Sequence, residues 1–277
     1  MSSIKLVVTD LDGTLLKDDK SISKEDVTML SVLKKKQIFR VAATGRNMNK
    51  VVDVIPSLSI FDYIAFSSGA GIYDCRNDKL IYSRNIDIDA VNELNRFLIN
   101  RDVSFYLSKS IPDNMYYWFY KGNKECNEFA YFFRQHEHFL EELPANGEVS
   151  SQANQYLIIF KDYKQFCELK ENIECFSGHF KILRASSPYL TRYIWMEIFH
   201  KDVSKGNAVR FLCNHLDVNQ DATIGIGNDY NDLDLLEFTY YSYLADNGPE
   251  ELKSGYLPAP CNEKSAFSFC INNHINK

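Results

Sequence analysis

The 277-residue chain lacks the features that mark several classes of protein. No apolar run approaches the roughly 18–20 residues of a membrane-spanning helix, so we expect no membrane insertion. Aspartate and glutamate (37) outnumber lysine and arginine (31), the net charge is −6 at pH 7, and there is no dense basic block. Because nucleic-acid binding usually requires a basic surface, we expect no nucleic-acid partner.

Cysteine is sparse and follows no pattern. The seven cysteines are scattered and odd in number, without a C-x-x-C pair, which is typical of ordinary thiols in a reducing compartment. The chain begins with Met1-Ser2-Ser3-Ile4 and runs directly into a predicted strand, with neither a basic leader nor a small-residue cleavage site. We therefore expect a cytoplasmic protein. The sequence carries no signal for the oligomeric state.

The composition that is present predicts a folded protein of one large domain or two ordinary ones. Hydrophobic residues make up 45% and charged residues 25% of the chain, which is the balance of a globular protein with a real core. The aromatic residues are distributed unevenly, since 23 of the 38 (2 Trp, 17 Tyr and 19 Phe) lie within residues 84–200. The middle of the chain therefore differs from its ends.

Strand and helix patterns alternate at both ends of the chain. The predicted strands there are residues 4–9, 39–43, 63–66, 223–226 and 241–245, and helical spacing follows Ser23, Asn47 and Ser204. This alternation predicts an α/β fold with a doubly wound, mainly parallel sheet. Ligands of such sheets bind beyond the carboxyl ends of the strands, where each predicted strand here is followed by a polar loop.

The middle of the chain predicts a second domain inserted into the first. Residues 115–120 and 156–160 are typical of strands in a mixed sheet, and helical patterns lie around 88–100, 124–142 and 163–176. We therefore expect a core formed by residues 1–83 and 200–277, with a mixed α+β domain of residues 84–199 between its two parts.

Two aspartates, Asp10 and Asp12, stand directly after the first predicted strand in the sequence D-L-D-G-T. Two carboxylates this close need a cation between them, or one of them must hold a proton. Mg²⁺ takes oxygen ligands and usually joins one or two carboxylates to a substrate phosphate. The pattern therefore indicates phosphate chemistry, in which one aspartate attacks phosphorus and the other moves the proton of the leaving group.

Four segments together resemble one known family. Asp10-Leu11-Asp12-Gly13-Thr14-Leu15 resembles the first motif of the haloacid dehalogenase (HAD) superfamily and, within it, of the Cof-like hydrolases. The resemblance extends, in the order of the family, to residues 43–46 (A-T-G-R), 203–208 (V-S-K-G-N-A) and 227–232 (G-N-D-Y-N-D). The inserted domain falls where that subgroup carries a cap that selects the leaving group.

The resemblance implies a Mg²⁺-dependent phosphatase that hydrolyses small phosphomonoesters, with sugar phosphates as the best substrate class. It implies that Asp10 is the nucleophile, which forms an aspartyl-phosphate, and that Asp12 is the general acid and base. The expected phosphate-binding residues are Thr44, Gly45, Arg46, Lys205 and Asn231. The expected metal-binding residues are Asp10, Asp12, Asn228 and Asp232, with Asp229 as a further option.

Physical chemistry agrees with these roles, because a carboxylate that attacks a phosphomonoester dianion meets like-charge repulsion. Lys205 is expected at a helix N-terminus, where the helix dipole also favours anions. Thr44 offers a hydroxyl group and Gly45 a backbone N–H that a phosphate oxygen can approach. Apart from Mg²⁺, we therefore expect the protein to bind a small phosphorylated metabolite.

The sequence departs from the family pattern at two positions. Many relatives have G-D-x-x-N-D in the fourth motif, where this chain has Asn228 in place of the first aspartate. An amide oxygen can bind Mg²⁺, but the change removes one negative charge and is expected to weaken the site. Relatives also often carry asparagine where this chain has Ser68, which places one polar contact in question.

Two alternatives remain open from the sequence. A phosphomutase would use the same Asp10 but return the phosphoryl group to a bound sugar. A non-catalytic protein of the same fold, which binds a phosphorylated metabolite, is compatible with Asn228. The substrate itself, and the residues of the inserted domain that select it, cannot be named from the sequence.

Overall fold

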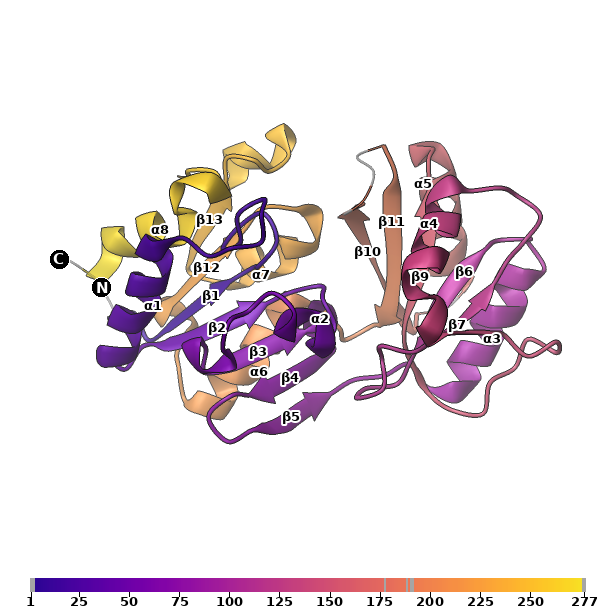
Figure 1. Cartoon of the computed structure of the whole chain (residues 1–277), viewed down its shortest axis with the longest axis horizontal. Helices are drawn as coiled ribbons and strands as arrows, with labels where there is room; N and C mark the ends of the chain where they lie inside the picture. The colour runs from indigo at the N-terminus through magenta and orange to yellow at the C-terminus, as the bar shows by residue number, and fades with distance from the viewer. Residues whose placement is uncertain (1–2, 177, 188, 190–191, 276–277) are drawn as a thin grey trace. The chain divides into compact units, whose positions relative to one another are not determined.

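The structure, a computed structural model, describes residues 3–176, 178–187, 189 and 192–275. The chain divides into two compact units (Figure 1). We call Met1–Ser83 together with Ser204–Lys277 the core unit, and Arg84–Val203 the inserted unit.

The core unit is built on a sheet of eight strands in the order β14-β13-β12-β1-β2-β3-β4-β5. The strands from β14 to β3 in this order run parallel, whereas β4 and β5 are antiparallel. The sheet and its flanking helices confirm the predicted α/β class. The strands are β1 (Leu6–Thr9), β2 (Phe39–Ala43), β3 (Tyr63–Phe66), β4 (Gly71–Asp74), β5 (Lys79–Ser83), β12 (Thr223–Gly227), β13 (Tyr241–Ala245) and β14 (Leu257–Ala259).

The central strands of this sheet are buried on both faces, which explains their largely apolar sequences; the charged Arg40 of β2 is paired with Asp62 at 3.0 Å. One core cluster joins alternate residues of β1, β2 and β3 to α6 (Lys205–Leu216) and α7 (Leu233–Phe238). The other core-unit helices are α1 (Lys24–Lys35), α2 (Met48–Val52) and α8 (Ala266–Ile275). Because helices pack against these strands, only the strand ends are left to meet ligands.

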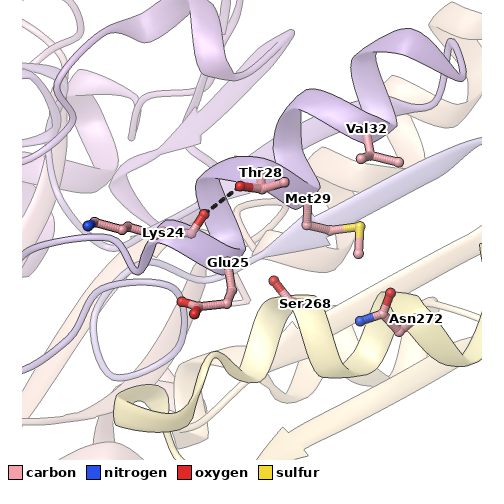
Figure 2. A pocket seen from close by; sticks show the side chains of 7 residues that line it. All are labelled: Lys24, Glu25, Thr28, Met29, Val32, Ser268 and Asn272. Atoms are coloured by element: carbon pink, nitrogen blue, oxygen red, sulfur yellow. Dashed lines mark hydrogen bonds between the residues drawn. The ribbon is translucent and has the colours of Figure 1, made fainter.

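Helices α1 and α8 lie side by side, although they stand at opposite ends of the chain (Figure 1). Asp26 of α1 joins them, because its Oδ1 accepts hydrogen bonds from the backbone N–H of Ser268 (2.8 Å) and from its hydroxyl group (2.6 Å). A hollow between the two helices is shown in Figure 2; it is lined by Lys24, Glu25, Thr28, Met29, Val32, Ser268 and Asn272. None of the predicted site residues lines it.

The inserted unit contains a sheet of six strands in the order β10-β11-β9-β6-β7-β8. All neighbouring strands are antiparallel except β7 and β8, which are parallel. The strands are β6 (Phe105–Lys109), β7 (Tyr117–Tyr120), β8 (Leu140–Glu142), β9 (Ala153–Phe160), β10 (Phe180–Ser186) and β11 (Ile194–His200). Its helices are α3 (Ile88–Ile99), α4 (Asn127–His136) and α5 (Tyr163–Phe176).

The aromatic residues of the inserted unit form much of its core. Phe105 and Tyr156 pack with α3 and α5 in one cluster, whereas Tyr106 packs with Phe129 and Phe132 of α4 in another. Because successive residues of a strand point to opposite faces, Phe105 and Tyr106 serve the two sides of one sheet. The aromatic excess of the sequence is therefore largely a packing feature.

One element differs from the sequence-based expectation. A helix was predicted around residues 124–142, but α4 ends at His136 and is followed by a short 3₁₀ turn and by strand β8. The backbone of β8 pairs with β7, where Tyr117 is the partner of Leu140. Pairing with a distant strand thus prevailed over the local helical pattern. No helix among the described residues has the length and apolar character needed to cross a membrane.

Candidate active site

The ends of three adjacent parallel strands bring the predicted motifs together. Strand β1 pairs with β2 on one side and with β12 on the other. Asp10 follows β1, Thr44 follows β2 and Asn228 follows β12. Because parallel strands end at the same edge of a sheet, residues that are far apart in the sequence meet there.

Lys205 lies between two carboxylates at this edge. Its Nζ donates to Oδ1 of Asp10 at 2.7 Å and to Oδ1 of Asp232 at 2.6 Å. The side chains of Lys205 and Asp232 are fully buried, and that of Asp10 is 7% exposed. Ser204 caps the N-terminus of α6 by accepting from Asn207 N–H, which fixes Lys205 as the first residue of that helix.

The buried charges of this group are unevenly balanced. The pKa of Asp10 is raised to about 8, because burial and the charges of Asp232 and Asp12 together outweigh the opposing effect of Lys205. Burial alone would lower the pKa of Lys205, but Asp10 and Asp232 hold it above its usual value. The ammonium group is therefore charged, and the site can accept further positive charge beside Asp10.

Asp12 is held by two cationic side chains. Arg46 approaches it with Nε (2.5 Å) and Nη2 (2.7 Å), and Nζ of Lys20 donates to Oδ1 at 2.9 Å. Burial tends to raise the pKa of Asp12, but hydrogen bonds and charges from Arg46 and Lys20 outweigh it, so the pKa lies below its usual value. In this structure Arg46, which was predicted to bind phosphate, thus contacts the second aspartate.

Asp232 and Asp229 organise the fourth motif. Oδ2 of Asp232 accepts the backbone N–H groups of Asn228 (2.8 Å) and Asp229 (3.1 Å), while Oδ1 accepts from Lys205. Asp229 caps the short turn Tyr230–Asp232, where its Oδ1 accepts from Tyr230 N–H at 2.8 Å. Both carboxylates therefore have structural partners, and those of Asp232 link the fourth motif to Lys205.

The side chain of Asn228 lies against three oxygen atoms. With the amide nitrogen turned inward, it donates to the backbone oxygen of Asp12 (2.9 Å), to Oγ1 of Thr14 (2.9 Å) and to Oδ2 of Asp10 (3.3 Å). With the amide oxygen turned inward, Thr14 still donates to it, but it faces the acceptors of Asp10 and Asp12. The nearest atoms around this amide are thus oxygen atoms of the first motif.

Polar groups of the second and third strand ends lie near Asn231. The hydroxyl group of Thr44 is buried and accepts from the backbone N–H of Arg46 (3.1 Å). A side chain at Gly45 would approach Nδ2 of Asn231 and Oγ of Ser68, each at 3.7 Å from its Cβ. Ser68 itself has φ 56°, a left-handed conformation that favours asparagine over serine. Glycine at position 45 thus leaves space between two polar side chains.

Two residues of this site were not identified from the sequence. Lys20 reaches Asp12 because residues 17–21 form a tight turn, with Lys17 N–H bonded to Ser21 O at 2.9 Å. Thr14 belongs to the first motif, but its contact with Asn228 joins residues 214 positions apart. No local sequence signal marks either contact, and the left-handed backbone of Lys20 (φ 67°) is known only from the structure.

The oxygen atoms around Asn228 fit a hard divalent cation. Within the described ranges, no group of three or more histidine, cysteine, aspartate or glutamate side chains is arranged to hold a metal. A backbone carbonyl of Asp12, a carboxylate oxygen of Asp10 and the side-chain amide of Asn228 nevertheless converge. Mg²⁺ accepts oxygen ligands of these types, and water molecules complete its coordination.

Comparison with known proteins gives one consistent result. The family model described as haloacid dehalogenase-like hydrolase matches residues 7–255. A protein of Buchnera aphidicola (subspecies Acyrthosiphon pisum), named "Putative phosphatase BU028/BU029", is 26% identical over 277 residues, which cover 97% of this chain and 95% of that protein.

Solved structures have the same fold. The structure of SMU.1108c from Streptococcus mutans matches with a TM-score of 0.81 and 19% identity, over 99% of this chain and 100% of that one. The structure described as the HAD subclass IIB sugar phosphatase BT4131 matches with a TM-score of 0.74 and 15% identity, over 97% and 98% of the two chains. Since its family model spans most of the sequence and its motifs meet at one sheet edge, the chain belongs to the haloacid dehalogenase-like hydrolases, which confirms the resemblance to Cof-like members.

Proposed function

We propose that the protein is a Mg²⁺-dependent phosphatase that hydrolyses small phosphomonoesters through an aspartyl-phosphate, with sugar phosphates as its substrate class. The observation that carries the proposal is the buried carboxylate of Asp10, which is bonded to Lys205 at 2.7 Å and followed two residues later by Asp12. A nucleophile, a buried cation and a second carboxylate are the groups that phosphoryl transfer through an aspartate requires.

In the first step, a carboxylate oxygen of Asp10 forms a bond to phosphorus, and the bond from phosphorus to the leaving oxygen breaks. Lys205 offsets the negative charge of Asp10, so that a phosphate dianion can approach it. Asp232 is a positioning residue in this scheme, because its carboxylate holds Lys205 and the backbone of Asn228 together.

Asp12 moves the protons. It gives a proton to the leaving oxygen in the first step. In the second step it takes a proton from the water molecule that attacks phosphorus, the bond from phosphorus to Asp10 breaks, and inorganic phosphate leaves. Arg46 and Lys20 lower the pKa of Asp12, which favours the ionised form that acts as the base in the second step. Protonation for the first step requires these cations to be turned toward the substrate phosphate instead, which gives Arg46 its proposed phosphate-binding role.

Three further groups are proposed to hold the phosphate oxygens. The Thr44 hydroxyl accepts from Arg46 N–H and can donate its own hydrogen to a phosphate oxygen. Gly45 offers a backbone N–H in the space beside Asn231, whose amide nitrogen lies 3.7 Å from the Cβ position of that glycine. Neutral donors of this kind orient a phosphate without adding the cost of another buried charge.

The proposed metal ligands are a carboxylate oxygen of Asp10, the backbone oxygen of Asp12 and the side chain of Asn228. When bound there, Mg²⁺ supplies positive charge that offsets the repulsion between Asp10 and the phosphate dianion. Asp232 and Asp229, which were also expected among the ligands, are assigned here to positioning and to capping the turn.

Sugar phosphates are supported as substrates by the structural relative BT4131, which is described as a sugar phosphatase. A screen of phosphorylated metabolites tests this class directly. We expect release of inorganic phosphate from small sugar phosphates; isomerised product without free phosphate would instead identify a phosphomutase, and binding without either product would identify a non-catalytic protein.

Asp10→Asn tests the mechanism, because it keeps the shape of the side chain and removes the nucleophile. We expect the turnover of p-nitrophenyl phosphate to fall by at least about 10³-fold. Asp217→Asn is the matched control, since Asp217 is exposed and follows the C-terminal end of α6, opposite the end that carries Lys205, and its turnover should remain at the wild-type level. Unchanged turnover in Asp10→Asn would show that Asp10 is not the nucleophile.

A further inference from the structure

The amide of Asn228 is placed to serve the site in two orientations. Its inward atom lies 2.9 Å from the backbone oxygen of Asp12 and 3.3 Å from Oδ2 of Asp10, both of which can only accept hydrogen bonds when Asp10 is ionised. As a nitrogen, this atom donates to both oxygens. When this atom is the amide oxygen, it and the oxygens of Asp12 and Asp10 repel one another unless a cation lies between them.

The surroundings hold Asn228 in this position. Its backbone N–H is bonded to Asp232 at 2.8 Å, and Thr14 Oγ1 lies 2.9 Å from the inward atom. Gly13, with φ +75°, packs against the other side, where an added Cβ would lie only 2.5 Å from Asn228 Nδ2. The side chain is therefore confined, and the motion that remains is a half-turn of the amide plane about the Cβ–Cγ bond.

Thr14 suits both orientations, because a hydroxyl group can donate to an amide oxygen or accept from an amide nitrogen. Thr14 Oγ1 lies 2.9 Å from the inward amide atom in each case, whether that atom is the oxygen or the nitrogen. A half-turn of the amide therefore changes the partners of Asp10 and Asp12 without losing the hydrogen bond to Thr14.

We propose that Asn228 stabilises the metal site in two states: its amide nitrogen bonds Asp10 and Asp12 in the metal-free protein, and its amide oxygen binds Mg²⁺ after a half-turn. The second state rests on the Mg²⁺ dependence of the proposed function, whereas the first does not. An aspartate at 228 cannot serve the metal-free state, because its carboxylate has no hydrogen to donate and would add a further negative charge, at a half-buried position, beside Asp10 and Asp232.

The proposal predicts opposite effects of Asn228→Asp in the two states. Without metal, in EDTA, we expect the melting temperature to fall by about 3 °C or more relative to wild type. In a calorimetric titration with Mg²⁺ we expect affinity to rise about tenfold, because a carboxylate replaces a neutral ligand. Saturating Mg²⁺ should therefore raise the melting temperature of the variant more than that of wild type.

Asn219→Asp is the matched control, since the same charge is added at an exposed residue that makes no side-chain capping hydrogen bond and precedes β12, whereas Asn228 follows that strand. We expect it to change both quantities much less than Asn228→Asp does. Equal metal-free stability of wild type and Asn228→Asp would overturn the hydrogen-bonding role, and equal Mg²⁺ affinity would overturn the ligand role. If neither protein bound Mg²⁺, the proposed metal dependence would fail, but the stability comparison in EDTA would still decide the first role.

Discussion

At the scale of single residues, the candidate site depends on one buried lysine. Lys205 shares its ammonium group between Asp10 and Asp232, at 2.7 and 2.6 Å, with its own side chain fully buried. Buried charges are costly unless they are paired and hydrogen-bonded, so each of these three groups requires the others. The lysine that supports the proposed chemistry thus also holds the fold of the site together.

We predict that Lys205→Met destabilises the protein by about 3–5 kcal/mol, because two buried carboxylates lose their counter-charge. We also expect turnover of p-nitrophenyl phosphate to fall by at least about 10²-fold. Urea unfolding and steady-state assays measure the two effects. Lys201→Met, at an exposed lysine, should leave both unchanged; similar stability of the two variants would contradict the proposed role of the buried ion pairs.

At the scale of elements, the joining of α1 to α8 closes one face of the core unit. Asp26 is fully buried and bonds Ser268 twice, while Ser23 accepts from Asp26 N–H (3.1 Å) and from Ser265 (2.9 Å). Helix α1 packs on β2 and α8 on β12, which are the two neighbours of the strand that carries Asp10. The contacts between α1 and α8 therefore help to hold β2 and β12 in place on either side of β1, although none of them belongs to the candidate site.

We predict that Asp26→Ala lowers the free energy of unfolding by about 1–3 kcal/mol, because two buried donors of Ser268 lose their acceptor. Glu25→Ala is the control, since Glu25 is the neighbouring acidic residue on the same helix and lies exposed at the hollow of Figure 2. Chemical denaturation followed by circular dichroism measures both. A loss for Asp26→Ala no greater than for Glu25→Ala would show that the two helices do not depend on this contact.

At the scale of the whole molecule, the chain forms two units that each have a hydrophobic core. In the inserted unit Leu94 is fully buried among residues of α3, β6 and β9, and in the core unit Leu33 is fully buried on α1. The chain passes from one unit to the other only after Ser83 and after Val203. Local opening of one unit can therefore occur while the other stays folded.

We predict that Leu94→Ala destabilises the inserted unit by about 2–5 kcal/mol, since it leaves a cavity in a closed core. Hydrogen exchange followed by mass spectrometry should show faster exchange in α3, β6 and β9 but not in β1 or β12. Leu33→Ala is the reciprocal variant, with faster exchange expected in α1 and β2 only. Equal acceleration in both units would show that they unfold as one.

Much of the core unit was predictable because its signals are local. The strands at residues 63–66 and 241–245 have the predicted bounds, since buried parallel strands are short apolar runs bounded by polar loops. The helix predicted around 124–142 was too long, because β8 exists only through pairing with β7. The antiparallel strands β4 and β5 at one end of the sheet were also not predicted.

The α/β class, the resemblance to the family and the polar groups at the strand ends follow from the amino-acid sequence alone, because strand periodicity and motif order are properties of neighbouring residues. Which of these groups touch is set by the folded chain: Lys205 contacts Asp10 and Asp232, and Arg46 and Lys20 contact Asp12. The contact of Asn228 with the first motif likewise joins positions more than 200 residues apart. Such contacts depend on strand order and loop geometry, and no local pattern encodes either of them.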